Sequence, residues 1–306
     1  MLRSAWAFWF LAANWPGTHV QDPRSAVLRL GVANSIRLPS SQEIAGADIS
    51  NDGAVLYWFR TGPPVLRSGH DSVALCTGRI RDPVAAAFVG SSSRVEILDS
   101  NPDGGSVRVL FAGSGRCGVA RHVRTIGSAF RAARAGAGWI IAVRRAGGNA
   151  SYTFIGSGPF LSWRLPADSA NGSPTNPLNS SVAGSGTMFV LSSMRWPYRT
   201  AVVSGTGVVL REFQMSQGVP LDTDYIALGA IPVPGGFLQT MVDPRSDRRR
   251  LVLMDSLGTV LSLTEIETAF GAVASSPNGR FVLALRRTDY IELVTYKVLG
   301  SAERGR

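Results

Sequence analysis

A unit of 40 to 50 residues that recurs six times is the feature that most constrains the fold of this chain. Each unit opens with a strand of small residues, passes through a tight turn and enters a strongly apolar second strand. The turns centre on positions 52, 92, 136, 186, 236 and 278, so successive turns lie 40, 44, 50, 50 and 42 residues apart. This spacing is typical of four-stranded antiparallel sheets repeated around a central axis. Small residues in the opening strands suit the crowded region next to that axis.

The two ends of the chain complement each other. The last unit supplies strands at 272–276, 280–287 and 290–298 and is then one strand short, whereas an orphan strand at 26–38 precedes the first unit. Pairing the orphan as the outer strand of the last unit closes the ring and removes two exposed sheet edges. The sequence therefore predicts an all-β, six-bladed β-propeller, with the last blade closed by an N-terminal strand.

The units differ in how clearly their strands can be read. Unit five shows four strands, at 225–233, 237–243, 249–256 and 259–266. In unit one, prolines within 61–71 obscure the third and fourth strands. No stretch after the N-terminus keeps a period of 3.6 residues, so we expect no helix. The expected organisation is one propeller domain at 26–299, followed by a C-terminal tail at 300–306.

Two turns carry a resemblance to known propellers. SNDGAVLYW at 50–58 and SSPNGRFVLAL at 275–285 look like the first hairpin of TolB-like and WD-repeat blades. The chain thus resembles the β-propeller superfamily over about residues 26–299. Units two to five lack a regular Ser-Pro-Asp-Gly turn, and no terminal Trp-Asp dipeptide recurs. The tryptophan-docking pattern of quinoprotein propellers and the aspartate box of sialidases are also absent, so the resemblance implies the architecture and selects no family.

Residues 1–22 favour an export signal or an anchor. The start MLRSAWAFWFLAA combines one arginine, a short apolar run and small residues at its end, as secretory signals do. The run is shorter than the about twenty residues that span a bilayer. Its aromatic side chains suit, alternatively, a retained anchor in the membrane interface or in a partner groove. These residues are Trp6, Phe8, Trp9, Phe10 and Trp15. A packed N-terminal strand or a misassigned start is the third alternative.

The chain contains only two cysteines, Cys76 and Cys117. They lack the CxxC spacing of zinc and redox sites, so we expect no metal site. In an oxidising compartment they could form one disulfide, and otherwise they are two buried thiols. The sequence alone leaves both alternatives open, because it does not fix the distance between their α-carbons.

Catalytic motifs are missing from the sequence. The only histidines are His19, His70 and His122, and no HExxH, nucleophile-elbow or Walker motif occurs. A Cys117–His122 thiolate pair would lie in an outer hairpin of unit two, far from the axis. The GxGxxG match from Gly113 to Gly118 lacks the acidic residue about twenty positions later that a dinucleotide site needs. We interpret it as a strand connection, and we expect no cofactor.

Carboxylates for glycoside chemistry would have to share one cleft. Glu265 and Glu267 lie on a predicted outer strand, on its solvent face and away from the axis. Asp222, Asp224 and Asp243 fall nearer to loops and are the best candidates for a site in the central channel. Nothing in the sequence distinguishes them from surface carboxylates.

Arginine dominates the charge. The formal net charge is +10 and the single lysine is Lys297. The connections between the second and third strands of a propeller open on one face of the disc. In five units these connections, or the strand ends leading into them, carry arginine. The residues are Arg60, Arg144, Arg145, Arg195, Arg248, Arg249, Arg250, Arg286 and Arg287, interleaved with Trp58, Trp196 and Tyr198. Unit two, with Asp99 and Asp103, interrupts the ring. Arginine and aromatic residues together are common at protein interfaces.

These features predict a non-enzymatic interaction or scaffold subunit. We expect it outside the cytoplasm, periplasmic or secreted, and docked through its basic face onto an acidic protein surface of a membrane-associated assembly. The first alternative is a glycosidase- or lactonase-like propeller enzyme with a carboxylate-lined channel. The second is a nucleic-acid binder, which the charge allows but the export-like start and the missing basic-aromatic motif disfavour. The aromatic N-terminus would add contact with a membrane interface.

Overall fold

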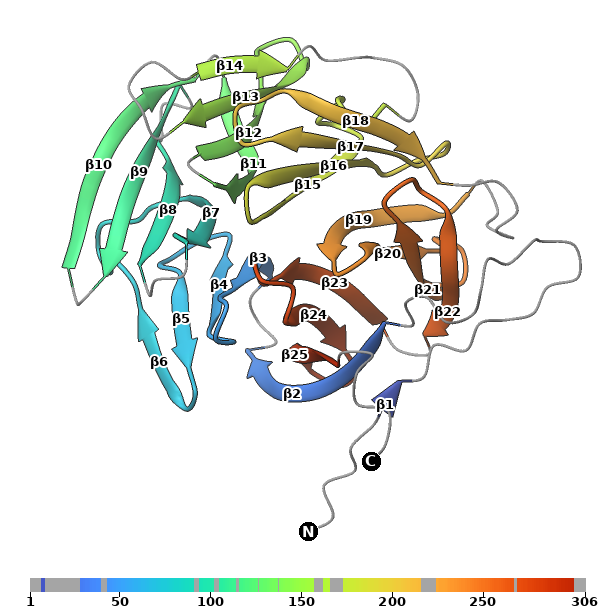
Figure 1. The fold of residues 1–306 in the computed structure, drawn as a ribbon. Helices are drawn as coiled ribbons and strands as arrows, with labels where there is room; N and C mark the ends of the chain where they lie inside the picture. The colour runs from blue at the N-terminus through green and yellow to red at the C-terminus, as the bar shows by residue number, and fades with distance from the viewer. Residues whose placement is uncertain are drawn as a thin grey trace, which may run out of the picture.

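Six antiparallel sheets are arranged as blades around a central axis (Figure 1). The computed structural model describes residues 7–8, 28–39, 43–90, 94–101, 105–113, 116–125, 127–136, 138–156, 162–165, 173–215, 224–266 and 269–299. Twenty-five strands occur in these ranges. The predicted all-β, six-bladed propeller is therefore confirmed. None of the described segments forms a helix that is long and apolar enough to cross a membrane.

Five blades each use four consecutive strands. Blade one contains β3 (Ile44–Ile49), β4 (Val55–Phe59), β5 (Val65–Ser68) and β6 (Asp71–Ala74). Blade two contains β7 (Pro83–Phe88), β8 (Val95–Ser100), β9 (Ser106–Gly113) and β10 (Arg116–Arg124). Blade three contains β11 (Ser128–Ala135), β12 (Gly138–Arg144), β13 (Ala150–Gly156) and β14 (Ser162–Leu165). Blade four contains β15 (Ser180–Ser185), β16 (Met188–Ser193), β17 (Arg199–Ser204) and β18 (Val209–Gln214). Blade five contains β19 (Ile226–Val233), β20 (Gly236–Val242), β21 (Arg249–Asp255) and β22 (Val260–Ile266).

Blade six joins the two ends of the chain. It contains β23 (Ala269–Ser275), β24 (Phe281–Arg287), β25 (Ile291–Leu299), β2 (Arg29–Leu38) and β1 (Ala7–Phe8). β2 pairs antiparallel with β25 from Arg29 opposite Leu299 to Leu38 opposite Ile291. The closure predicted from the surplus and missing strands is confirmed, and Figure 1 shows β2 beside β25.

The N-terminal segment is described only at β1, where Ala7 lies opposite Gly31 and Phe8 opposite Leu30. This pairing agrees with the third alternative above, a packed N-terminal strand. Of the proposed anchor residues, Phe8 lies in β1. The remaining four, Trp6, Trp9, Phe10 and Trp15, lie outside the described residues. Export, cleavage and membrane contact stay predictions.

The hydrophobic core lies between neighbouring blades. The second strand of a blade is apolar on both sides, as in β4, because the flanking blades cover both of its faces. The outer strands lack this cover: all four residues of β6 are exposed. Burial is therefore greatest in the second strands and falls towards the rim, as expected where apolar burial is the main source of stability.

A polar contact crosses each of the six interfaces between blades. In chain order, the acceptors are Asp48 for the Phe88 N–H, Glu96 for Arg134 and Trp139, the Ser180 carbonyl for Arg131, Ser192 for the Ala230 N–H, Thr240 for the Ala272 N–H and Asn51 for the Asn278 N–H. Buried backbone groups such as the Ala230 N–H thereby gain partners that their own sheets do not supply. These contacts fix each blade relative to the next, and so they fix the walls of the central channel.

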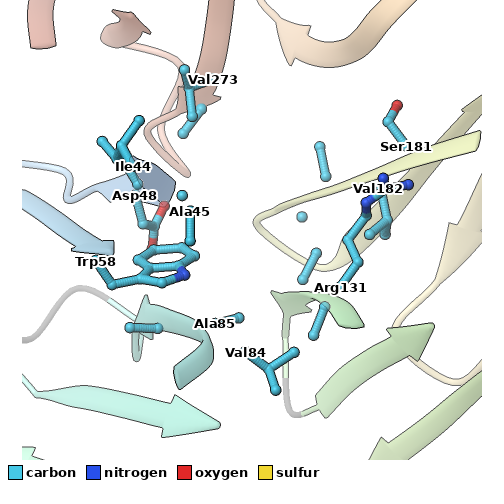
Figure 2. A pocket seen from close by; sticks show the side chains of 18 of the residues that line it. Ile44, Ala45, Asp48, Trp58, Val84, Ala85, Arg131, Ser181, Val182 and Val273 are labelled. Carbon is cyan, nitrogen blue, oxygen red and sulfur yellow. The ribbon is translucent and has the colours of Figure 1, made fainter. Parts of the chain in front are cut away.

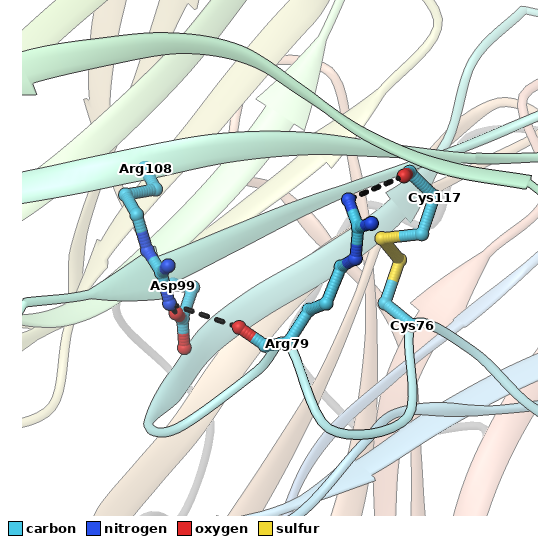
Figure 3. Close-up of a disulfide and its surroundings, with 5 residues drawn as sticks. All are labelled: Cys76, Arg79, Asp99, Arg108 and Cys117. Atoms are coloured by element: carbon cyan, nitrogen blue, oxygen red, sulfur yellow. Dashed lines mark hydrogen bonds and ion pairs between the residues drawn. A yellow bond between two sulfur atoms is a disulfide. The ribbon is translucent and has the colours of Figure 1, made fainter.

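A disulfide between Cys76 and Cys117 joins the rims of blades one and two, so the bridged alternative holds in the structure. The sulfur atoms are 2.03 Å apart and the α-carbons 5.3 Å apart. Figure 3 shows Arg79 beside the bridge, where its guanidinium donates to the Cys117 carbonyl at 2.9 Å. Asp99 is fully buried nearby and accepts hydrogen bonds from the Asp82 N–H and from Arg108. The linker between the two blades is thus held by one covalent and several polar contacts.

Candidate functional site

The exposed arginines at one face of the disc are the first component of the site. Arg60, Arg195 and Arg248 lie in the connections from the second to the third strand of blades one, four and five. Arg144 and Arg287 end the second strands of blades three and six, and all five of these residues are exposed. The placement predicted from the sequence is therefore correct for these residues.

Local turns present these side chains. Half-buried Arg145 opens a tight turn in blade three, where its N–H donates to the Asn149 carbonyl at 2.8 Å. Gly147 and Gly148 in this turn have φ of +93° and +87°, a region that glycine adopts without strain. In blade four the Tyr198 N–H donates to the Arg195 carbonyl at 3.0 Å. Short turns of this kind leave the guanidinium groups at the surface.

Arg249 and Arg250 require a correction, because they are not loop residues. They begin β21, and their side chains are 20% and 17% exposed. Arg249 donates to the Phe270 carbonyl of blade six at 3.0 Å and pairs with Asp247 at 3.3 Å. Arg250 pairs with Glu265 at 3.1 Å. Both guanidinium groups therefore hold strands and blades together.

Arg286 and Tyr198 are also engaged within the fold. Arg286 forms an ion pair with nearly buried Glu292 on the neighbouring strand, and that hydrogen bond raises the pKa of the guanidinium. Tyr198, expected at the partner surface, is 1% exposed and donates its hydroxyl to the Tyr225 carbonyl at 2.7 Å. Trp196 packs edge-on against the Tyr198 ring and is 38% exposed. Tyr198 is therefore closed to a partner, whereas Trp196 and the 34% exposed Arg286 side chain still reach the surface.

Blade two does not interrupt the face in the predicted way. Asp99 is fully buried, and its carboxylate accepts the Arg81 and Asp82 N–H groups at 3.1 and 2.8 Å. It therefore contributes structure to the linker and no surface charge. Asp103 lies outside the described residues.

A central cavity of about 1060 Å³ is the second component of the site. Residues of all six inner strands line it, and most of these residues are small. Figure 2 shows Asp48 and Trp58 on one wall, with Arg131 across the cavity beside Ser181 and Val182. Trp58 packs directly over Gly46, where an added Cβ atom would overlap the indole Cζ2. A glycine at this position of β3 therefore lets the indole form part of the channel wall.

The carboxyl groups that line the channel are not those expected from the sequence. They belong to Glu43, Asp48 and Asp82. Asp224 instead pairs with Arg245 away from the cavity, and exposed Asp243 accepts from Ser246, a hydrogen bond that lowers the pKa of Asp243.

Glu265 is exposed on the outer strand β22, as predicted. Asp222 and Glu267 lie outside the described residues. A sequence signal for Glu43, Asp48 and Asp82 did exist. Each of these carboxylates lies within a small-residue inner strand or directly before one.

Among the described residues, six arginines line the cavity, and sequence reasoning found only some of them. They are Arg60, Arg131, Arg134, Arg144, Arg249 and Arg287. Arg131 and Arg134 lie on the inner strand β11, within the small-residue pattern that marked that strand. Arg134 is 8% exposed and pairs with Glu96 at 2.7 Å, whereas Arg131 donates to the Ser180 carbonyl. Guanidinium groups therefore outnumber carboxyl groups on the channel wall.

Asp48 is the titratable group whose pKa the channel changes most clearly. Burial raises the pKa of its carboxyl to about 6, because the charged form loses hydration. Hydrogen bonds from the Phe88 and Ile49 N–H groups, both 2.9 Å long, and the positive charge of Arg134 act in the opposite direction. The carboxyl thus serves as a polar contact between blades one and two.

The structure also shows where the residues of the other candidate sites lie: the Cys117–His122 pair, the glycine-rich match and the possible metal ligands. Cys117 is in the disulfide and cannot supply a thiolate to His122, which lies on the outer strand β10. The glycine-rich match connects β9 and β10, as predicted for a strand connection. His19 lies outside the described residues. Within the described ranges, no group of three or more His, Cys, Asp or Glu side chains could hold a metal ion.

Comparisons with known proteins agree with the fold. A candidate TolB from Agrobacterium tumefaciens aligns with a TM-score of 0.56 and 14% identity, over 85% of this chain and 91% of that chain. The WD40 propeller domain of Doa1 aligns at 0.52 and 13%, over 90% and 97%. A candidate oxidoreductase (glucose dehydrogenase) from Thermus thermophilus aligns at 0.51 and 12%, over 85% and 99%.

The sequence matches no protein-family profile and no curated protein. At these identities the structural matches establish the propeller fold alone, since one fold hosts many functions.

Proposed function

We propose that this propeller is a non-enzymatic interaction module that docks through its basic face onto an acidic surface of a membrane-associated protein assembly. The observation that carries the proposal is the set of arginines presented by the connections between second and third strands. Five of the six blades present at least one exposed guanidinium group there, and that of blade one, Arg60, pairs with Glu43. A rigid disc with cations fixed on one face is suited to bind an extended anionic surface.

The available charge supports this proposal. Among the described residues, no carboxylate lies within 4.0 Å of the guanidinium groups of Arg145, Arg195 and Arg248. Guanidinium groups bind carboxylates through planar paired donors. An acidic partner would supply the carboxylates, and exposed Trp196 in the same set of connections would add apolar contact area.

The roles of two of the three channel carboxyl groups favour binding over catalysis. Glu43 pairs with Arg60 at 3.1 Å, and Asp48 accepts two backbone N–H groups. A general acid and base pair needs two carboxyl groups that are free to exchange protons with a substrate. An extracytoplasmic location is supported by the Cys76–Cys117 bridge, because disulfides persist mainly in oxidising compartments.

Affinity purification from detergent-solubilised membranes of the source cells, at stepped ionic strength, tests the proposal. The test variant is Arg145→Gln/Arg195→Gln/Arg248→Gln, which removes three positive charges and leaves the channel wall intact. We expect wild type to retain a stoichiometric partner that salt gradually displaces. The variant should lose the partner at lower ionic strength, because each exposed pair contributes up to about 1 kcal/mol and the three act together.

The matched control is Arg94→Gln/Arg211→Gln/Arg280→Gln. These three arginines are also exposed but lie on the opposite face or on the rim of blade four. The control should retain the partner as wild type does. Superimposable salt curves for all three proteins would contradict docking through this face. Recovery of a free monomer that hydrolyses a sugar or a lactone would favour the enzyme alternative.

A further inference from the structure

One extra residue interrupts the pairing of the inner strand with the second strand in five of the six blades. These β-bulges occur at Ala45, Val84, Phe130, Leu228 and Val273. A bulge leaves its extra residue outside the ladder and redirects the side chain. All five residues line the central cavity. We call them the apolar collar.

The collar lies near one mouth of the channel. Four of its members occupy the second or third position of their strand, and inner strands begin on the face where the second strands end. Two of these side chains are large and open to the cavity: Phe130 is 37% exposed and Leu228 is 41% exposed. Apolar side chains at five equivalent strands around one axis form a ring, whereas isolated exposed ones are ordinary at protein surfaces.

Guanidinium groups surround the same mouth. Arg144 ends β12 and Arg287 ends β24, and both line the cavity. Arg144 lies 5.4 Å and Arg131 5.8 Å from the centre of the Phe130 ring, measured from the guanidinium carbon. Arg131 is further held by the Ser180 carbonyl. The aromatic member of the collar is therefore flanked by two positive charges, of which Arg131 is fixed in place by the fold.

We infer that the channel mouth binds a single-chain amphiphile with an anionic head group, a carboxylate or a phosphate. The head group would lie against Arg144 and Arg131, which flank the Phe130 ring and present planar donors for either oxyanion. The apolar chain would lie along the collar and cover Phe130 and Leu228. A cavity of about 1060 Å³ is large enough for such a ligand.

This inference goes beyond the docking proposal and does not depend on it. The docking test changes Arg145, Arg195 and Arg248, none of which is among the residues that line the cavity. The amphiphile test uses purified protein without a partner. Either proposal can therefore fail while the other holds.

Titration of the purified chain with four probes tests the inference. The probes are decanoate, decyl phosphate, decyl maltoside and inorganic phosphate, with each amphiphile kept below the concentration at which it forms micelles. Calorimetry gives the affinity, and tryptophan fluorescence reports on the site because Trp58 and Trp139 line the cavity. We expect decanoate and decyl phosphate to bind, and the comparison of the two identifies the preferred head group. Decyl maltoside lacks the charge and inorganic phosphate lacks the chain, so both should bind at least tenfold more weakly.

Two variants separate the contributions. Arg144→Gln should weaken decanoate and decyl phosphate at least tenfold and bring their affinities towards that of decyl maltoside. Leu228→Ala should weaken all three decyl probes alike, because it shortens the apolar collar and leaves the charges in place. The control Arg94→Gln/Arg280→Gln should bind as wild type does.

Three results would overturn the inference: no binding of either charged amphiphile, equal binding of decyl maltoside, or inorganic phosphate binding as tightly as decyl phosphate. Circular dichroism and the denaturation midpoint check that each variant is folded. If the arginine variant does not fold, displacement of bound decanoate from wild type by inorganic phosphate and by decyl phosphate provides the second measurement. In that case equal displacement of decanoate by inorganic phosphate and by decyl phosphate, at the same concentration, would count against recognition of the decyl chain.

Discussion

Asn278 donates its backbone N–H to the Asn51 side-chain oxygen at 2.9 Å and its side-chain amide to the Asn51 carbonyl at 3.2 Å. The two residues are 227 positions apart in the sequence, in the first turns of blades six and one. These turns are the two that resemble known propellers in sequence. The same residues that define a local turn thus also join the first blade to the last, next to the closure made by β2 and β25.

Replacing Asn51 tests this contact. Asn51→Ala removes the side-chain acceptor, and we expect the free energy of unfolding to fall by about 1 kcal/mol, the usual contribution of one hydrogen bond. Equilibrium denaturation in urea measures the change. Asn34→Ala is the control, because the exposed Asn34 side chain accepts the neighbouring Ser35 N–H within its own strand. An equal loss in both variants would mean that contact between the blades adds nothing.

The closing strand gives the second prediction. Deletion of residues 1–38 removes β2, exposes the edge of β25 and uncovers buried Leu293 and Val294. We expect aggregation, since unpaired edges are templates for intermolecular pairing. Size-exclusion chromatography with light scattering measures it. Deletion of residues 1–27 keeps β2 and should leave a soluble monomer. A soluble, cooperatively folding 1–38 deletion would refute closure as a source of stability.

The disulfide gives the third prediction. The bridge closes a loop of 41 residues, and loop-closure entropy of this length corresponds to about 4 kcal/mol. Cys76→Ser/Cys117→Ser should therefore unfold at lower denaturant than the oxidised wild type. A reducing agent should lower the stability of wild type to that of the variant and leave the variant unchanged. Insensitivity of wild type to reduction, with the thiols shown to be free, contradicts this prediction.

Asp48 makes stability depend on pH. The pKa of the Asp48 carboxyl is raised to about 6 in the folded state. The contribution of Asp48 to stability is therefore complete below about pH 4 and is lost as the pH rises through about 6. The loss is about 3 kcal/mol at most, from the difference between the folded pKa and the usual aspartate value. Asp48→Asn cannot ionise, so its stability should lack this decline.

Urea denaturation of both proteins at intervals between pH 4 and pH 7 measures the difference. Asn offers one oxygen where Asp offers two, so the variant should be less stable at pH 4 and should approach wild type as the pH rises. The lowered pKa values of Asp52 and Asp243 affect stability below this window, because these carboxylates lose their favourable contacts only at more acidic pH. Parallel profiles of the two proteins would rule out a burial-raised pKa at Asp48.

Close approach of two inner strands gives the last prediction. A Cβ atom at Gly184 would overlap the Arg134 carbonyl oxygen of the neighbouring blade. Gly184→Ala should therefore move β15 away from β11 and cost about 1–3 kcal/mol of stability. Gly113→Ala is the matched control, because no heavy atom lies within 4 Å of the Cβ it would add. Thermal denaturation of both variants compares them, and equal midpoints would contradict the close approach.

The blades and their order could be predicted from the sequence because a propeller is assembled from local hairpins. Strand alternation, turn residues and small inner strands repeat within about 50 residues, so each blade is encoded in one stretch of chain. Counting strands then predicted that β2 pairs with β25, because an unpaired edge at both ends of the chain is unfavourable. The positive charge of one face of the disc could likewise be predicted, because arginines occur in the connections between second and third strands.

Only the tertiary structure decided which individual side chains are buried and which groups they contact. Arg248 and Arg249 are adjacent in sequence, yet Arg248 is exposed and Arg249 reaches the Phe270 carbonyl of the next blade. Asp99 is buried by the linker that it organises, and Cys76 meets Cys117 only because blades one and two pack together. Burial depends on which blade approaches from the neighbouring position. Periodicity along one strand records the face that a residue occupies, but not what packs against that face.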